Sequence, residues 1–234
     1  MVEVEVALVH SLVEAKLAPS WMSDVASTLA HASLDGAAIA VASRAGGNPV
    51  IPLVRELSAL ADAQHPGASD YVHVGATSQD ILDTAAMLVA RSAAREIAGR
   101  GRELVAALSS LADLHRATPM AGRTLGQHAS PTTFGLVAAG WLDGVLTAID
   151  RLESLTLPVS YGGAVGTLGV LAEIVAARRP DVSVDAQLES LLADLAQRLH
   201  LSSPAAPWHS NRLPIVAVGA ALAALVGAIG TMAM

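Results

Sequence analysis

A run of ten residues concentrates hydroxyl, amide and acidic side chains, and its hydroxyl and amide groups are suited to binding a small anion. Residues 75–84 read Gly-Ala-Thr-Ser-Gln-Asp-Ile-Leu-Asp-Thr, and apolar residues then recur at helical spacing. A helix that begins here presents free backbone N–H groups and the positive end of its dipole, which both attract anions. Thr77 and Asp80 match a capping box, a hydroxyl followed three residues later by an acid. The segment therefore predicts either a well-capped helix alone or an anion site at a helix start.

Two further segments carry groups that bind carboxylates. Residues 120–135 read Met-Ala-Gly-Arg-Thr-Leu-Gly-Gln-His-Ala-Ser-Pro-Thr-Thr-Phe-Gly, so Arg123 stands in a glycine-flanked loop. Its planar guanidinium suits a substrate carboxylate, although pairing with a surface acid is the structural alternative. Trp208, His209 and Arg212 form a later cluster, in which Arg212 is a candidate second carboxylate clamp.

Helical spacing runs through most of the chain, and no stretch predicts a strand. We expect an all-α fold with a small N-terminal helical domain in residues 1–76 and a bundle of long helices in residues 77–234. Ser130 and Pro131 read as the N-cap and first turn of a helix after a loop over 117–130. The expected helices lie near 4–12, 21–31, 35–45, 51–63, 78–115 (continuous, or divided near 99–101), 131–155, 167–178, 183–200 and 211–234.

Composition narrows the classes of function. The 234 residues are 53% hydrophobic but 3% aromatic, which suits closely packed helices rich in Ala, Leu and Val. A formal charge of −7 argues against general nucleic-acid binding, and the absence of cysteine excludes disulfide and thiolate chemistry. Glu3 and Glu5 stand where an export signal needs positive charge, so we expect a cytoplasmic protein.

The last segment permits two interpretations. Residues 213–234 contain no charged side chain and are long enough to span a bilayer. They lack a flanking basic cluster, and Pro214 stands where a first-turn proline belongs. A helix buried on all sides within a bundle has the same composition, so a bundle helix is the favoured interpretation and a membrane helix the alternative.

Five stretches in chain order form a recognisable set: residues 47–53 (Gly-Asn-Pro-Val-Ile-Pro-Leu), 71–80, 120–135, 162–168 (Gly-Gly-Ala-Val-Gly-Thr-Leu) and 207–209 (Pro-Trp-His). Together they resemble the signature segments of one enzyme superfamily. The sequence is similar to the 3-carboxy-cis,cis-muconate cycloisomerases of the fumarase/aspartase superfamily over nearly its whole length. The resemblance implies an all-α homotetramer that uses no cofactor or metal and acts on a small tricarboxylate from the degradation of aromatic compounds such as protocatechuate.

The resemblance also implies roles for individual residues. The chemistry is β-elimination beside a carboxylate, or its reverse, and the added negative charge needs fixed dipoles and cations. His73 and His128 are the candidate acids, although a lone histidine such as His73 is as often structural. The residues expected to bind substrate are Asn48, Thr77, Ser78, Gln79, Arg123, Thr124, Gln127, Trp208, His209 and Arg212.

Two departures separate this sequence from the full superfamily pattern. Leu125 stands where many members carry their acidic histidine, which favours a cycloisomerase over an adenylosuccinate-lyase-like enzyme. The third signature, Gly-Ser-Ser-x-Met-Pro-x-Lys-x-Asn-Pro, which holds the usual serine base, does not occur in the sequence. The chain thus resembles a cycloisomerase shortened at both ends. Either it acts as a cycloisomerase, alone or with a missing C-terminal part, or it is a catalytically silent helical assembly protein.

Overall fold

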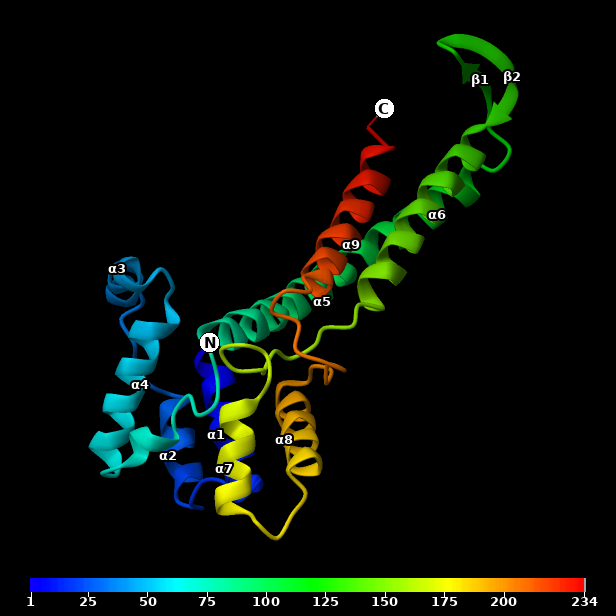
Figure 1. The fold of residues 1–234 in the computed structure, drawn as a ribbon. Coiled ribbons are helices and arrows are strands. Elements are labelled where there is room, and N and C mark those ends of the chain that lie inside the picture. Colours follow the sequence, from blue (N-terminus) through cyan, green and yellow to red (C-terminus); the bar gives the residue numbers. More distant parts are fainter. Residues whose placement is uncertain (234) are drawn as a thin grey trace. The chain divides into compact units, whose positions relative to one another are not determined.

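A computed structural model describes residues 1–233, which form nine α-helices, one 3-10 helix and a single β-hairpin. Two compact units divide this part of the chain (Figure 1). The first comprises residues 1–89 and 156–212, and the second comprises residues 90–155 and 213–234. The expected all-α class is confirmed. Residues 156–212 pack with the N-terminal helices in the first unit, and the expected domain division after residue 76 stays a prediction.

The first unit is built on α1, whose apolar residues recur every four positions. Val4, Leu8 and Leu12 are almost fully buried, and α2 and α8 pack against α1. The unit contains α1 (Val2–Glu14), α2 (Met22–Leu29), α3 (Gly36–Gly46), α4 (Val50–Gln64), the 3-10 helix η1 (Ala68–Tyr71), the start of α5, α7 (Gly169–Arg178) and α8 (Val184–Leu199).

The α5 helix is continuous from Ser78 to Leu114, a run of 37 residues. Of the two expected arrangements, the unbroken helix is therefore confirmed. Gly101 does not interrupt the helix, and its lack of a side chain leaves room for Ile149. A Cβ atom there would lie 2.6 Å from Cδ1 of Ile149. The glycine thus allows α6 (Phe134–Glu153) to approach α5 within the second unit.

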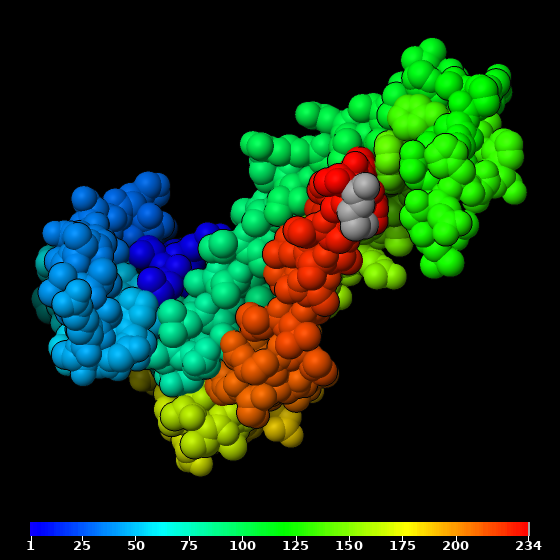
Figure 2. Space-filling model, turned by 90° about the horizontal axis from the view of Figure 1, so that it is seen from above, coloured from blue at the N-terminus to red at the C-terminus, as the bar shows by residue number. Residues whose placement is uncertain are grey.

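The core of the second unit lies among α5, α6 and α9 (Leu213–Gly230). Ala221 and Leu225 are the buried residues of α9, and they pack with Val145 and Ile149. Much of α9 remains open: Figure 2 shows one side of it, in red, with no segment lying over it. Within residues 1–233, α9 is the one helix long and apolar enough to cross a membrane, and 11% of its span is buried.

The absence of strands was a wrong prediction. Strands β1 (Pro119–Thr124) and β2 (Gln127–Thr133) form an antiparallel hairpin that covers most of the expected loop and the first residues of the expected helix. Both strands are largely exposed, so they lack the alternation of apolar and polar residues that marks a half-buried strand. Leu125 and Gly126 have φ of 49° and 72°, as a two-residue type I′ turn requires.

The start of α6 also differs from the expectation. Pro131 lies in β2 rather than in a first helical turn, and Ser130 is not the N-cap. Thr133 caps the helix instead, because its Oγ1 accepts a hydrogen bond from the Leu136 amide at 3.2 Å. The ladder is irregular near Gly122, where a Cβ atom would lie 2.5 Å from the Ser130 carbonyl oxygen. This close backbone approach accounts for the glycine.

Candidate functional site

The start of α5 has one half of the capping box that its sequence predicts. The Thr77 amide donates to Asp80 Oδ2 at 2.9 Å, which is the acid half of a capping box. The preceding residues form a turn, in which Gly75 has φ of 68° and the Ala76 amide donates to the His73 carbonyl at 3.3 Å. Within residues 1–233, the Thr77 and Ser78 hydroxyls form no hydrogen bond. They remain available to a ligand.

Asp80 is the centre of a buried hydrogen-bond cluster. Asp80 is 0% exposed, and its carboxylate accepts several hydrogen bonds that stabilise its negative charge. Oδ2 also accepts from the Gly163 amide at 3.0 Å. Oδ1 accepts from the Gly162 amide at 2.9 Å and from Ser160 Oγ at 3.3 Å, and lies 2.5 Å from His209 Nε2. Because a buried carboxylate is tolerated only with such partners, Asp80 holds residues 160–163 and His209 against the start of α5.

A second buried acid binds Arg212. Arg212 Nη1 and Nη2 donate to the Asp83 carboxylate at 2.6 and 2.8 Å, and Gln79 Nε2 donates to Asp83 Oδ1 at 2.8 Å. These bonds raise the pKa of Arg212, against the opposing effect of burial. The expected role of Arg212 as a substrate clamp stays a prediction, since its guanidinium already holds one carboxylate. The same guanidinium lies over the Trp208 ring, 5.2 Å from its centroid.

Trp208 is largely enclosed by the first unit. It is 3% exposed, and its Nε1 donates to the Val159 carbonyl at 2.8 Å. This bond anchors the segment that precedes Ser160. A role in forming a substrate pocket wall stays a prediction.

His73 has a partner that the sequence did not suggest. Its Nδ1 lies 2.7 Å from Glu5 Oε1, and Glu5 is 2% exposed although it stands on α1. Tyr161 lies near the buried acids Asp80 and Glu5. Its hydroxyl donates a hydrogen bond to the Val74 carbonyl at 2.8 Å. Burial, followed by the charges of Asp80 and Glu5, raises the pKa of Tyr161 far above its ordinary value, so the phenol stays a neutral donor.

The hairpin gathers four of the predicted residues. Arg123 lies opposite His128 in the ladder, and Thr124 lies opposite Gln127. Directly opposed residues share one face of an antiparallel pair, so Arg123 and His128 lie side by side. All four are exposed and belong to the second unit. Leu125 at the turn is 96% exposed.

Asn48 has a local structural role in the first unit. Its Oδ1 accepts from the amides of Val50 at 3.0 Å and Ile51 at 3.4 Å, where α4 begins. An asparagine before a helix satisfies free N–H groups in this way. Its expected contact with substrate stays a prediction.

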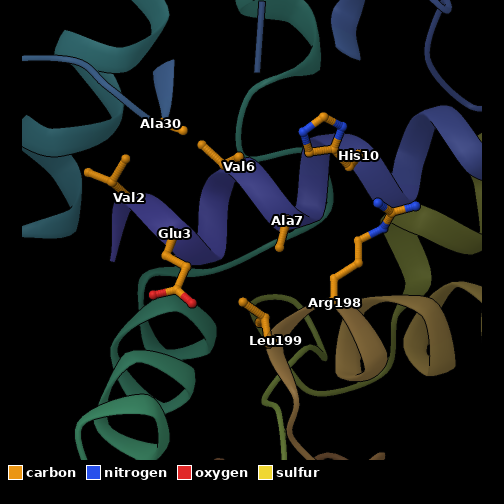
Figure 3. Close-up of a pocket in the computed structure, with 8 residues that line it drawn as sticks. All are labelled: Val2, Glu3, Val6, Ala7, His10, Ala30, Arg198 and Leu199. Carbon is orange, nitrogen blue, oxygen red and sulfur yellow. The ribbon is translucent and has the colours of Figure 1, made fainter. Parts of the chain in front are cut away.

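A separate cavity lies beside α1. It has a volume of about 530 Å³ and is formed by residues of α1, Ala30 and the end of α8 (Figure 3). Its wall is largely apolar, with Glu3, His10 and Arg198 as its charged or titratable members. Burial, and then the charge of Arg198, lower the pKa of His10. None of the predicted site residues lines this cavity.

Sequence reasoning found the polar segments but missed several partners. It assigned Asp80 to capping and orienting its neighbours, which the hydrogen bonds confirm. It missed Glu5, Asp83 and Ser160. The burial of Glu5 could have been predicted, because Glu5 stands beside Val4 and Leu8 in the apolar stripe of α1, where a charged residue is exceptional. Within residues 1–233, no group of three His, Asp or Glu side chains is arranged to hold a metal ion.

Comparison with known proteins agrees with this architecture. A family model described as a lyase matches residues 10–226. The chain is 45% identical to a nitrosuccinate lyase of Streptomyces davaonensis, over 100% of this chain and 49% of the relative. It is 40% identical to a 3-carboxy-cis,cis-muconate cycloisomerase of Bradyrhizobium diazoefficiens, over 86% of this chain and 43% of the relative.

A solved structure shares the fold. The crystal structure of the 3-carboxy-cis,cis-muconate lactonizing enzyme from Pseudomonas putida aligns with a TM-score of 0.87 and 32% identity, over 99% of this chain and 51% of that chain. The chain therefore belongs to the lyase family of the fumarase/aspartase superfamily. It spans about half the length of the curated relatives it matches.

Proposed function

We propose that this chain provides the carboxylate-binding part of an enzyme that lactonises 3-carboxy-cis,cis-muconate. The observation that carries the proposal is the start of α5, where the buried Asp80 cluster holds Thr77 and Ser78 in place with their hydroxyls unused. A helix start with free donors favours a carboxylate, and the substrate of this reaction carries three.

The reaction requires stabilisation of a doubly charged intermediate. One substrate carboxylate oxygen adds to a carbon–carbon double bond, a C–O bond forms, and the electron pair moves onto the carbon beside another carboxylate. A proton then adds to that carbon, so the product is an isomer of the substrate. We propose that Thr77, Ser78 and Gln79 bind this second carboxylate, because fixed dipoles stabilise developing charge without reorganising. His73 and His128 are the candidate proton donors.

The exposed hairpin carries Arg123, the cation that we propose binds a substrate carboxylate. Arg123 with Thr124 and Gln127 would bind a further carboxylate, since arginine forms charge-assisted and often bidentate bonds to this group. Asn48, Trp208, His209 and Arg212 complete the proposed binding residues. For Arg212 this role requires that it share its guanidinium between Asp83 and substrate.

A nitrosuccinate lyase activity is the second candidate, favoured by the 45% identity to such an enzyme. A base would remove the proton beside one carboxylate, a carbon–carbon double bond would form, and nitrite would leave with the C–N bonding pair. The same carboxylate-binding donors would serve. Nitrite release from nitrosuccinate, set against loss of diene absorbance from the muconate, distinguishes the two activities.

We also propose that the chain forms a cytoplasmic homo-oligomer, with a tetramer as the expected size. The support is α9, which is apolar along its length and largely uncovered. Exposed apolar surface of this extent marks an interaction site. Sedimentation as a clean monomer near 23.8 kDa would contradict the proposal. Recovery only in detergent would support the membrane alternative.

Substrate binding by the purified 234-residue chain tests the function. Titration calorimetry with the tricarboxylate should detect binding, and Arg123→Ala should weaken it by roughly 1.5–3 kcal/mol, the value of a charge-assisted hydrogen bond. Arg100→Ala is the matched control, because Arg100 is also exposed and, among the described residues, forms its ion pair only with Glu96 on its own helix. Equal affinities for the two variants would refute the role of Arg123.

The same preparation tests catalysis. The superfamily's serine-base motif does not occur in these residues, so we expect binding with little turnover by this polypeptide alone. Turnover at roughly 1–1000 per second would show that the chain has another base. No binding of either substrate would favour the catalytically silent assembly protein. Turnover of adenylosuccinate would favour the remaining alternative, an adenylosuccinate-lyase-like enzyme.

A further inference from the structure

Glu5 is a buried acid whose surroundings are unusual for its helix. It lies on the apolar side of α1 and is 2% exposed, and within residues 1–233 its carboxylate has His73 as its one hydrogen-bond partner. Its Oε1 lies 2.7 Å from His73 Nδ1, whereas Oε2 is buried without a hydrogen bond. A buried acid with one unsatisfied oxygen costs stability. Among the acids of residues 1–233, Glu5 is the one with such an oxygen, and it is the acid that contacts His73.

His73 is itself held in an unfavourable backbone conformation. Its φ is 60°, a left-handed value that costs a residue other than glycine about 1–2 kcal/mol. Ala76 donates to the His73 carbonyl and closes the turn that leads to Thr77. Strained backbone conformations of this kind are concentrated at functional sites, and His73 lies beside the candidate binding segment. Here the strained turn directs the imidazole ring back toward Glu5.

The contact determines which ring nitrogen carries a proton. An ionised carboxylate only accepts hydrogen bonds, so the short contact to Oε1 requires a proton on Nδ1. Neutral imidazole has one N–H, and Nε2 is then left with a free lone pair. When the ring is protonated, Nε2 carries the added proton. Every proton that His73 gains or loses therefore passes through Nε2.

We propose that Glu5 is a positioning residue that fixes the Nδ1–H tautomer of His73 and reserves Nε2 for proton exchange with a carboxylate-bearing substrate. The substrate half of this inference rests on the proposed function, in which His73 is a candidate proton donor. The tautomer half does not, because it depends on the Glu5 contact alone. A carboxylate that orients a histidine in this way acts through that histidine.

Nitrogen NMR of the histidine side chains tests the tautomer directly. The chain is labelled with ¹⁵N-histidine and measured without substrate, about two pH units above the ordinary histidine pKa. His73→Asn identifies the signal, because asparagine tolerates a left-handed φ. The wild-type spectrum should place the His73 proton on Nδ1, with Nε2 at the position of an unprotonated nitrogen.

Two substitutions of Glu5 separate its chemistry from its packing. Glu5→Leu fills similar buried space without an acceptor, so the signal of a fixed Nδ1–H should be lost. Glu5→Gln keeps an acceptor oxygen, so the Nδ1–H should remain. Glu3→Leu is the matched control, because Glu3 is an exposed acid on the same helix and should leave the spectrum of His73 unchanged.

The outcomes are decisive even where one variant fails to fold. A wild-type His73 with its neutral proton on Nε2, or a Glu5→Leu protein that retains the fixed Nδ1–H, overturns the proposal. If circular dichroism shows that Glu5→Leu is unfolded, loss of the Nδ1–H in folded Glu5→Gln overturns it instead. Failure of the tricarboxylate titration would refute the proposed function and leave these spectra unaffected, so the two failures are distinguishable.

Discussion

Replacement of Asp80 by asparagine should destabilise the first unit strongly. The buried carboxylate accepts two bonds at Oδ2, from the amides of Thr77 and Gly163, and three at Oδ1. An asparagine amide places an NH₂ group at one of these positions. In either orientation at least one backbone amide then faces this NH₂ group, and the remaining donors bond to a neutral acceptor in place of a charged one. Hydrogen bonds to a charged group contribute about 1.5–3 kcal/mol each, so we expect a loss of roughly 3–6 kcal/mol.

Urea denaturation at fixed protein concentration measures this loss. The free energy of unfolding should fall with little change in the denaturant slope, because the fold and the surface exposed on unfolding are retained. Asp35→Asn is the matched control. Asp35 also accepts two backbone N–H bonds, at 2.9 and 3.0 Å, but both go to one oxygen at an exposed helix start, where asparagine caps equally well. A loss at Asp80 within about 1 kcal/mol of the control would refute the reasoning.

Three further outcomes follow from contacts in the structure. Arg212→Ala should cost about 3 kcal/mol in urea denaturation, because it leaves buried Asp83 without its bidentate partner; a loss below 1 kcal/mol would contradict this. The lowered pKa of His10 means that the folded state binds its proton less readily than the unfolded state, so stability is present above the unfolded value of about 6.5 and is lost as the pH falls below it. His10→Gln should therefore flatten the dependence of melting temperature on pH in that range, and an unchanged slope would count against it. Leu125→Asn should stabilise by up to about 1 kcal/mol, since Leu125 occupies a left-handed turn position with its side chain exposed, and Leu125→Ala is a control that should show no gain.

The sequence by itself predicted the elements that local chemistry controls. The four-residue spacing of Val4, Leu8 and Leu12 identified a buried helix face, and the helical spacing of apolar residues after Ser78 identified the start of the long helix. Asp80 was recognised as a cap because a capping box involves residues only three positions apart. These features depend on neighbours in the chain, so a single sequence contains their cause.

The hairpin was missed for an equally physical reason. Its strands are largely exposed, so no apolar face distinguishes them from a loop, and the turn carries Leu125 where asparagine is the usual signal. Ser130 and Pro131 have the chemistry of a helix start, yet pairing with β1 places Pro131 within a strand. Cross-strand pairing overrides local preference whenever it satisfies the backbone hydrogen bonds.

The tertiary structure alone decided how the buried charges are paired. Glu5 lies 68 positions from His73, Asp83 lies 129 from Arg212, and Asp80 binds amides more than 80 positions away. A carboxylate can be buried only where donors converge on it, and that convergence depends on packing of distant segments. The sequence thus determined which polar residues were available and where the helices begin. Only the folded chain determined which acid faces each histidine or arginine, because burial makes those long-range contacts obligatory.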